Sequence, residues 1–262
     1  MTLAKYRAVV AIAMRQAAAA RVVFLGRAVF YVMLLLIYAR IWQLVASQGS
    51  LGAFGRTDLI WYLAVTEWIA LSMPPVHTEI ESDIRSGNIA YLLPRPVSYF
   101  WMRFAEGLGT LLTRMAVLGL FGFGFAFALG GGLPTGGVLA LICGALTAVV
   151  AATLNLVFYA MIGLSAFFIE DTSPVYWVWQ KLSFVFGGLM FPLDMYPSAL
   201  QKIANATPFP SLLYAPGRIA IGAEPAFLWC STLHLAAWTL VAVFAAHFAY
   251  RRALKALELN GG

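Results

Sequence analysis

The sequence predicts an all-α integral membrane protein with six transmembrane helices, an N-terminal interfacial helix and an outer segment of broken helices. Three observations support this fold class. The chain is 62% hydrophobic and 11% charged, whereas soluble domains are about 45–50% apolar and about 25% charged. Its mean hydropathy is +0.83. Finally, six spans of about 20 residues each fit within its 262 residues and leave room for loops.

The apolar runs set the expected spans within a single transmembrane domain, 1–262. Pro74 and Pro75 end the second run, the glycine-rich turn 130–137 separates the third from the fourth, and Pro174 follows the break after the fourth. Proline and glycine clusters are typical of such breaks. The six spans are expected at 28–46, 59–75, 108–129, 138–168, 175–191 and 227–248.

Residues 1–21 precede the first span and are amphipathic. Their apolar residues recur at helical spacing, and basic residues lie mostly on the other side. Such a helix can lie in the headgroup region of the bilayer with its basic face toward anionic lipid. The alternative is a cytoplasmic extension of the first span. The apolar stripe consists of Leu3, Tyr6, Val10, Ala13, Met14 and Ala17.

Two segments between spans are long enough to have structure of their own. The loop 76–98 carries both charges and apolar residues. The segment 192–226 is apolar but contains five prolines before residue 220, so short helices or a re-entrant excursion are expected there, because irregular backbone at membrane depth must be buried in protein.

The distribution of basic residues predicts the orientation. If the N-terminus is cytoplasmic, thirteen of the seventeen Lys and Arg residues lie on the inner side and three in outer loops. Lys and Arg are enriched on the cytoplasmic side of membrane spans, so both termini are expected inside. The net charge of +6 is explained by this bias, and no nucleic-acid partner is expected.

Catalytic motifs are absent from the sequence. None of the four lysines follows a glycine, which excludes a phosphate-binding loop. His77, His234 and His247 are isolated from one another. The chain is therefore not expected to be an enzyme, and no metal site is predicted.

Two charged residues interrupt predicted spans. Arg40 lies about 9 Å and Glu67 about 12 Å from the outer ends of spans one and two, at 1.5 Å per residue. A charge at such depth is unfavourable unless it is paired, hydrated or near the interface. The two residues are interpreted as a structural ion pair, as part of a solute pathway, or as both.

The loop after span two carries a family resemblance. It reads Asp83-Ile-Arg-Ser-Gly-Asn-Ile89 and then Leu92-Leu-Pro-Arg-Pro96, while Gly188-Leu-Met-Phe-Pro192 follows span five. In these motifs the chain resembles the six-span permease subunit of a type-2 ATP-binding-cassette exporter. The likeness covers nearly the whole chain.

The resemblance implies that the loop 76–98 forms a cytoplasmic coupling helix that docks on an ATPase. Two cytoplasmic ATPase subunits and a second identical or similar permease would complete the transporter in a bacterial cytoplasmic membrane. No cofactor is expected on this chain, since ATP and Mg would be bound by the partner ATPase. We expect Ile84, Ile89, Leu92 and Leu93 to insert into the ATPase, Asp83 and Arg85 to form a polar rim, and Gly87 to permit a turn.

The function expected from these observations is ATP-driven export of a hydrophobic or amphipathic solute. The alternative is a secondary transporter or channel driven by an ion gradient, with Glu67 as the coupling carboxylate. The usual mark of that class is a pair of broken helices in symmetry-related halves, and no internal repeat is evident in the sequence.

Overall fold

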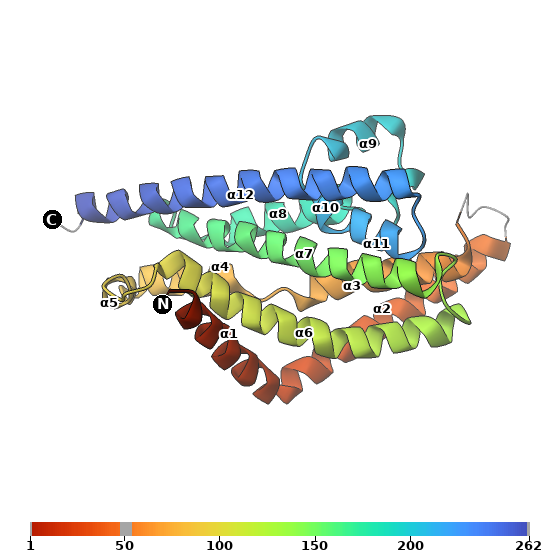
Figure 1. Ribbon diagram of the computed structural model, residues 1–262, viewed down its shortest axis with the longest axis horizontal. Coiled ribbons are helices and arrows are strands. Elements are labelled where there is room, and N and C mark those ends of the chain that lie inside the picture. The colour runs from red at the N-terminus through yellow and green to blue at the C-terminus, as the bar shows by residue number, and fades with distance from the viewer. Residues whose placement is uncertain (1, 48–53, 261–262) are drawn as a thin grey trace.

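The computed structural model describes residues 2–47 and 54–260, and every regular element within these ranges is helical (Figure 1). Long helices lie side by side, and α4, α5 and the described ends of the chain lie at the same end of the bundle. We call this the α4 end. The elements in chain order are α1 Thr2–Ala19, α2 Arg21–Ser47, α3 Arg56–Ser72, α4 Val76–Arg85, α5 Ile89–Leu92, α6 Tyr99–Gly130, α7 Gly137–Leu164, η1 Ser165–Phe167, α8 Ser173–Phe186, η2 Leu193–Met195, α9 Ser198–Asn205, α10 Phe209–Leu212, α11 Tyr214–Ala220 and α12 Pro225–Asn260.

Helix α3 is the centre of the bundle. It contacts α2, α6, α7 and α11, and its residues from Asp58 to Ile69 are all buried. The helix ends just before Pro74, as the sequence predicts. Two guanidinium groups bind carbonyls at this end: Arg27 donates to the Leu71 carbonyl, and Arg114 Nη1 lies 2.7 Å from the Met73 oxygen. Cations at a helix C-terminus also interact favourably with the helix dipole.

Five helical stretches in the described part of the chain are long and apolar enough to cross a membrane: 24–47, 56–85, 99–130, 137–167 and 225–255. Four of the predicted spans correspond to α2, α3, α6 and α7 with shifted ends, and the predicted span 227–248 lies within the longer α12. In particular, α6 begins at Tyr99, nine residues before the predicted start, as one continuous helix of 32 residues.

The predicted span 175–191 is the exception. Its helix, α8, has only 14 residues, or about 21 Å of helix, which is too short to cross the hydrocarbon core alone. It ends because Gly188 adopts a left-handed conformation with φ of +64° and Pro192 follows. Instead of one helix, α8, α10 and α11 follow one another along α7 (Figure 1). The continuous span that the sequence predicts at 175–191 is therefore not observed, and short helices occupy this part of the bundle.

The segment 192–226 consists of η2, α9, α10 and α11, in keeping with its prolines. Helix α11 packs along α7, and its C-terminal turn approaches the start of that helix closely. The Gly136 N–H donates to the Ile221 carbonyl at 3.1 Å. This contact fixes the end of the bundle that lies opposite α4.

Helix α1 is the predicted amphipathic helix, although Met1 lies outside the described residues. Much of its apolar stripe faces α6 rather than lipid: Ala13 is buried, and Tyr6 and Val10 are half-buried. The two helices approach closely at Gly109, where an added Cβ would lie 2.8 Å from the Ala13 Cβ. The basic residues Lys5, Arg7 and Arg15 are exposed, as the sequence predicts.

Candidate functional site

The loop 76–98 forms two short helices, α4 and α5, joined by a turn. Gly87 in this turn has φ of +74°, a conformation that strains residues with a Cβ. This confirms the turn predicted at Gly87. Around it, Arg85, Ser86, Asn88, Ala90 and Tyr91 are exposed. We call residues 85–96 the tip.

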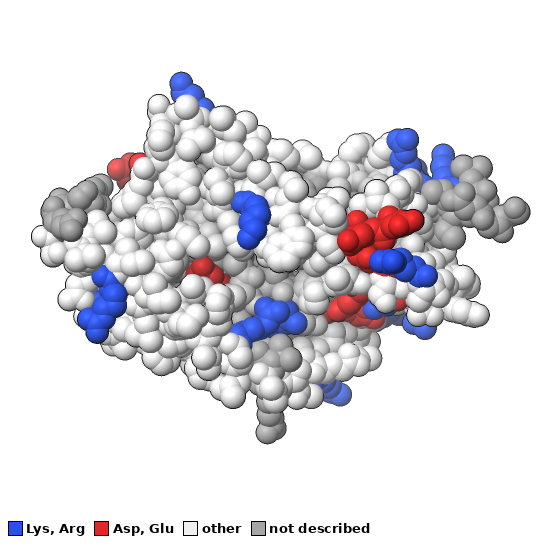
Figure 2. All heavy atoms as spheres, turned by 180° about the vertical axis from the view of Figure 1, so that it is seen from behind, with Lys and Arg blue, Asp and Glu red and all other residues white. Residues whose placement is uncertain are grey.

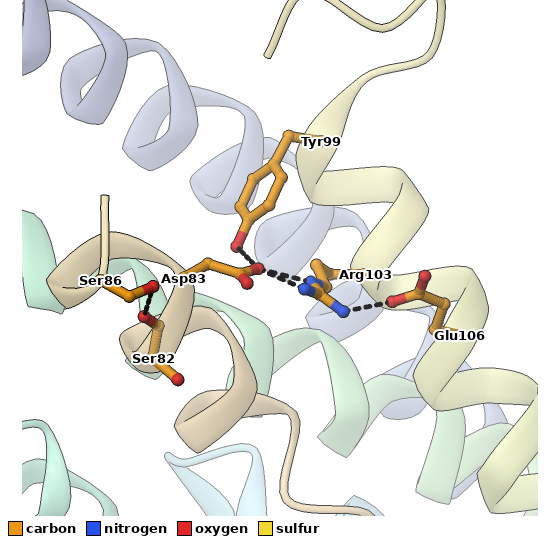
Figure 3. Close-up of polar contacts among 6 residues, drawn as sticks. All are labelled: Ser82, Asp83, Ser86, Tyr99, Arg103 and Glu106. Atoms are coloured by element: carbon orange, nitrogen blue, oxygen red, sulfur yellow. Dashed lines mark hydrogen bonds and ion pairs between the residues drawn. The ribbon is translucent and has the colours of Figure 1, made fainter. Parts of the chain in front are cut away.

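Asp83 anchors α4 to the first turns of α6 (Figure 3). Its carboxylate accepts hydrogen bonds from the Tyr99 hydroxyl at 2.7 Å and from Arg103 Nε at 2.7 Å. Arg103 also pairs with Glu106 at 2.6 Å on its own helix. Tyr99 and Arg103 are one turn apart and therefore lie on the same face of α6.

The sequence places Asp83 at the exposed polar rim, and this placement is wrong. The residue is only 7% exposed, and its oxygen is already used by Tyr99 and Arg103. A buried carboxylate needs such charged and hydrogen-bonding partners. Asp83 therefore holds the tip to the bundle. Arg85, by contrast, is exposed as predicted and pairs with Glu81 at 3.2 Å.

A second anchor joins α4 to the segment before α8. Glu81 accepts hydrogen bonds from the Thr172 hydroxyl at 2.5 Å and the Thr172 N–H at 3.3 Å. The neighbouring Asp171 accepts a hydrogen bond from the Ser173 N–H at 2.9 Å. Hydrogen bonding by the Ser173 backbone and side chain holds the pKa of the Asp171 carboxyl below its usual value. The start of α8 is thus fixed relative to α4.

His77 forms the third contact between α4 and the rest of the bundle. Its ring stacks on Tyr176 of α8 with centroids 4.0 Å apart and meets the edge of Tyr159 of α7. Together with Asp83 and Glu81, it connects α4 to α6, α7 and α8. A displacement of α4 would therefore be felt by three helices at once.

The apolar residues predicted to insert into a partner are less accessible than expected. Ile89 is 3% exposed and belongs to the core, while Ile84, Leu92 and Leu93 are half-buried against it. Ile89 is therefore corrected from a docking to a core residue. Tyr91, by contrast, is 81% exposed, and the sequence analysis missed it. The exposure of Tyr91 could have been predicted from helical spacing, because Ile89, Leu92 and Leu93 lie on one side of a helix and Tyr91 lies on the other.

Charged side chains gather at the α4 end. On the face in Figure 2, acidic and basic residues cluster at this end, while the rest of the surface is largely uncharged with a few isolated charges. An uncharged surface suits contact with hydrocarbon, and a charged end suits water and a protein partner.

Arg40 and Glu67 do not form the predicted ion pair. Arg40 is exposed and donates to Gln43 on its own helix at 3.3 Å. The buried stripe of α2 runs through Tyr31, Leu35, Ala39 and Trp42, so Arg40 is turned away from α3. Glu67 is 4% exposed and lines a cavity between α2, α3 and α8.

A serine and a histidine also meet, on α10 and α12. The Ser211 oxygen lies 2.6 Å from His234 Nδ1, and the Trp238 indole N–H donates to His234 Nε2 at 3.0 Å. An indole nitrogen is only a donor, so Nε2 carries no proton and Nδ1 donates to Ser211. In this arrangement His234 donates to Ser211, unlike the base of an activated nucleophile, which accepts the hydroxyl proton.

Comparison with known proteins identifies the family. Residues 18–261 match the family described as ABC-2 family transporter protein. No curated protein matches the chain. The match covers every helix from α2 to α12, including α4 and the tip, and the chain is a multi-pass membrane protein. It belongs to the ABC-2 family of transporter membrane proteins.

Proposed function

We propose that this protein is the permease subunit of an ATP-driven exporter that moves a hydrophobic or amphipathic solute out across a bacterial cytoplasmic membrane. Two separate ATPase subunits bind ATP and Mg, and a second identical or similar permease completes the transporter. In this arrangement both termini and the α4 end are cytoplasmic. The family match and the charged α4 end support the proposal.

The observation that carries the proposal is the way the tip is built. It offers an exposed aromatic, Tyr91, beside the exposed Arg85 and Arg95. Aromatic and arginine side chains are enriched among residues that dominate protein interfaces. The Asp83 and Glu81 anchors tie this surface to α6 and to the start of α8. Motion of an ATPase bound at the tip would therefore reach the spans through hydrogen bonds.

Transport driven by an ion gradient is the second candidate. It draws on Glu67, a buried carboxylate for which the described residues supply no ion pair. Intramembrane carboxylates of this kind often serve as coupling sites. Transport of solute by vesicles that contain this permease and no ATPase would favour this candidate over the ATP-driven one.

The test of ATPase docking is Tyr91→Ala, with Trp229→Ala as the control. Trp229 is also an exposed aromatic, at 68%, but lies near the start of α12. We expect Tyr91→Ala to weaken ATPase binding about thirtyfold, the effect of losing about 2 kcal/mol at an interface hot spot. Affinity is measured with purified partners in nanodiscs. Wild-type ATPase binding and transport in Tyr91→Ala would contradict the docking assignment.

A further inference from the structure

A cavity of about 400 Å³ lies between α2, α3 and α8. Phe30 and Leu34 contribute from α2, Phe184 from α8 and Tyr159 from α7. Its lining is mainly apolar and aromatic, and α2 and α3 both belong to stretches long and apolar enough to cross a membrane. Pockets of this size with a few convergent polar groups are typical small-molecule sites.

Glu67 is the acidic residue of this cavity. Its side chain is 4% exposed, and within residues 2–47 and 54–260 no hydrogen bond or ion pair reaches its carboxylate. The flanking polar residue Thr66 is satisfied differently, since its hydroxyl donates to the Leu189 carbonyl at 2.6 Å. A carboxylate buried without a partner is unfavourable as an anion, and a cation bound in the cavity would offset that cost.

The basic residue of the cavity, Arg27, is already engaged. Its guanidinium donates to the Leu71 carbonyl at the end of α3, where the helix dipole also favours a cation. Arg27 is half-buried, whereas Glu67 is nearly fully buried. The two charges therefore differ in what they offer: Arg27 has a partner, and the Glu67 carboxylate has none among the described residues.

The aromatic lining is also suited to a cation. Tyr159 and Tyr176 both line the cavity and meet edge to face, with centroids 5.3 Å apart. Aromatic faces attract organic cations, and more strongly where water is excluded. Gln180 adds one neutral polar group. No cluster of three metal-type ligands occurs among the described residues, so an organic cation fits this site better than a metal ion.

We propose that this cavity binds a monovalent organic cation with an apolar body, and that the Glu67 carboxylate is its counter-charge. The inference rests on the proposed function, because such a cation would be the class of solute transported. It also links the site to the tip. Tyr176, a wall of the cavity, stacks on His77 of α4, so the docking element and the ligand site share one contact.

The test uses two probes of the same shape and opposite charge, tetraphenylphosphonium and tetraphenylborate. Equilibrium binding of each is measured to the full-length permease in nanodiscs without ATPase. We expect Glu67→Gln to weaken tetraphenylphosphonium binding about tenfold, as expected for loss of a charge-assisted contact. Glu67→Asp should retain most of the binding. Glu224→Gln removes an exposed carboxylate near the start of α12 and should leave binding unchanged.

The outcomes separate this inference from the proposed function. Equal tetraphenylphosphonium affinity in the wild type and Glu67→Gln overturns the inference, as does an equal loss in Glu224→Gln or equally tight binding of tetraphenylborate. Unfolding midpoints of all variants show whether a loss of binding reflects misfolding. If Glu67→Gln is misfolded, binding by Glu67→Asp decides the question, because this variant keeps the carboxylate: loss of binding in a folded Glu67→Asp variant would overturn the inference. Failure here leaves ATPase docking at Tyr91 untouched, since that is read from a different measurement.

Discussion

The two ends of the helix bundle are held together by different physical means. At the α4 end, long charged side chains reach between elements: Asp83 binds Tyr99 and Arg103, and Glu81 binds Thr172. At the opposite end, backbones touch directly. An added Cβ at Gly136 would lie 2.5 Å from the Gly222 Cα, and one at Gly144 would lie 2.6 Å from the Ala220 Cα.

Hydrogen bonds to a carboxylate occur at both ends, since at the opposite end Asp58 accepts from the Thr135 N–H at 2.8 Å and the Thr135 hydroxyl at 2.7 Å. At the opposite end, side chains of α3 donate mainly to backbone carbonyls: Thr57 to Gly130 at 2.7 Å and Trp61 to Gly132 at 2.9 Å. Such contacts satisfy the carbonyls that a helix leaves free at its C-terminus. Charged side chains can keep their partners while elements shift, whereas backbone contacts permit little movement.

The largest expected effect comes from breaking the close contact at the opposite end. Gly144→Val would push side-chain atoms into the Ala220 backbone, and overpacking of this kind costs about 3 kcal/mol. The matched control is Gly124→Val, because a Cβ at Gly124 meets nothing within 4 Å. Unfolding midpoints in detergent measure both. Equal destabilisation by the two changes would show that the α7–α11 contact is looser than described.

A smaller effect is expected from breaking the Asp83 anchor at the α4 end. Asp83→Asn removes the charge that binds Arg103 and should cost about 2 kcal/mol, the range for a hydrogen bond to a charged group. Arg103→Gln should have a related effect. Because the residues are in contact, the double change should cost less than the sum of the single changes. Strict additivity in a thermal unfolding cycle would argue against the anchor.

The smallest effect is expected at Arg40, a charge that belongs to neither end. Its side chain is exposed, and the hydrogen bond to Gln43 is the one polar contact found for it among the described residues. Arg40→Gln should therefore change the free energy of unfolding by less than about 0.5 kcal/mol, and equally in the wild type and in Glu67→Gln. A marked loss of stability that disappears in the Glu67→Gln background would restore the predicted ion pair.

The sequence determined the fold class and the position of the tip, because both depend on local pattern. Apolar runs mark the long helices, Pro74 and Pro75 mark the end of α3, and Gly87 marks the turn of the tip. These features follow from what each residue type permits in its own backbone or in lipid. Contacts with residues distant in the sequence are not needed to predict these features.

Only the tertiary structure decided which polar groups meet. Asp83 and Arg103 are 20 residues apart in sequence, and Glu81 and Thr172 are 91 apart. The spacing of charges within one helix does not reveal such partners. Arg40 and Glu67 illustrate the same limit, since similar depths in two spans say nothing about the rotation of each helix about its axis.

The early end of α8 could also not be predicted from the sequence. Residues 175–191 are apolar enough for a span, but the left-handed Gly188 ends the helix early, and the Gly188 carbonyl accepts a hydrogen bond from the Tyr62 hydroxyl. Glycine is compatible with both a helix and a break. Hydropathy thus predicts an apolar segment, whereas contacts with α3 and α7 determine whether that segment forms one long helix or several short ones.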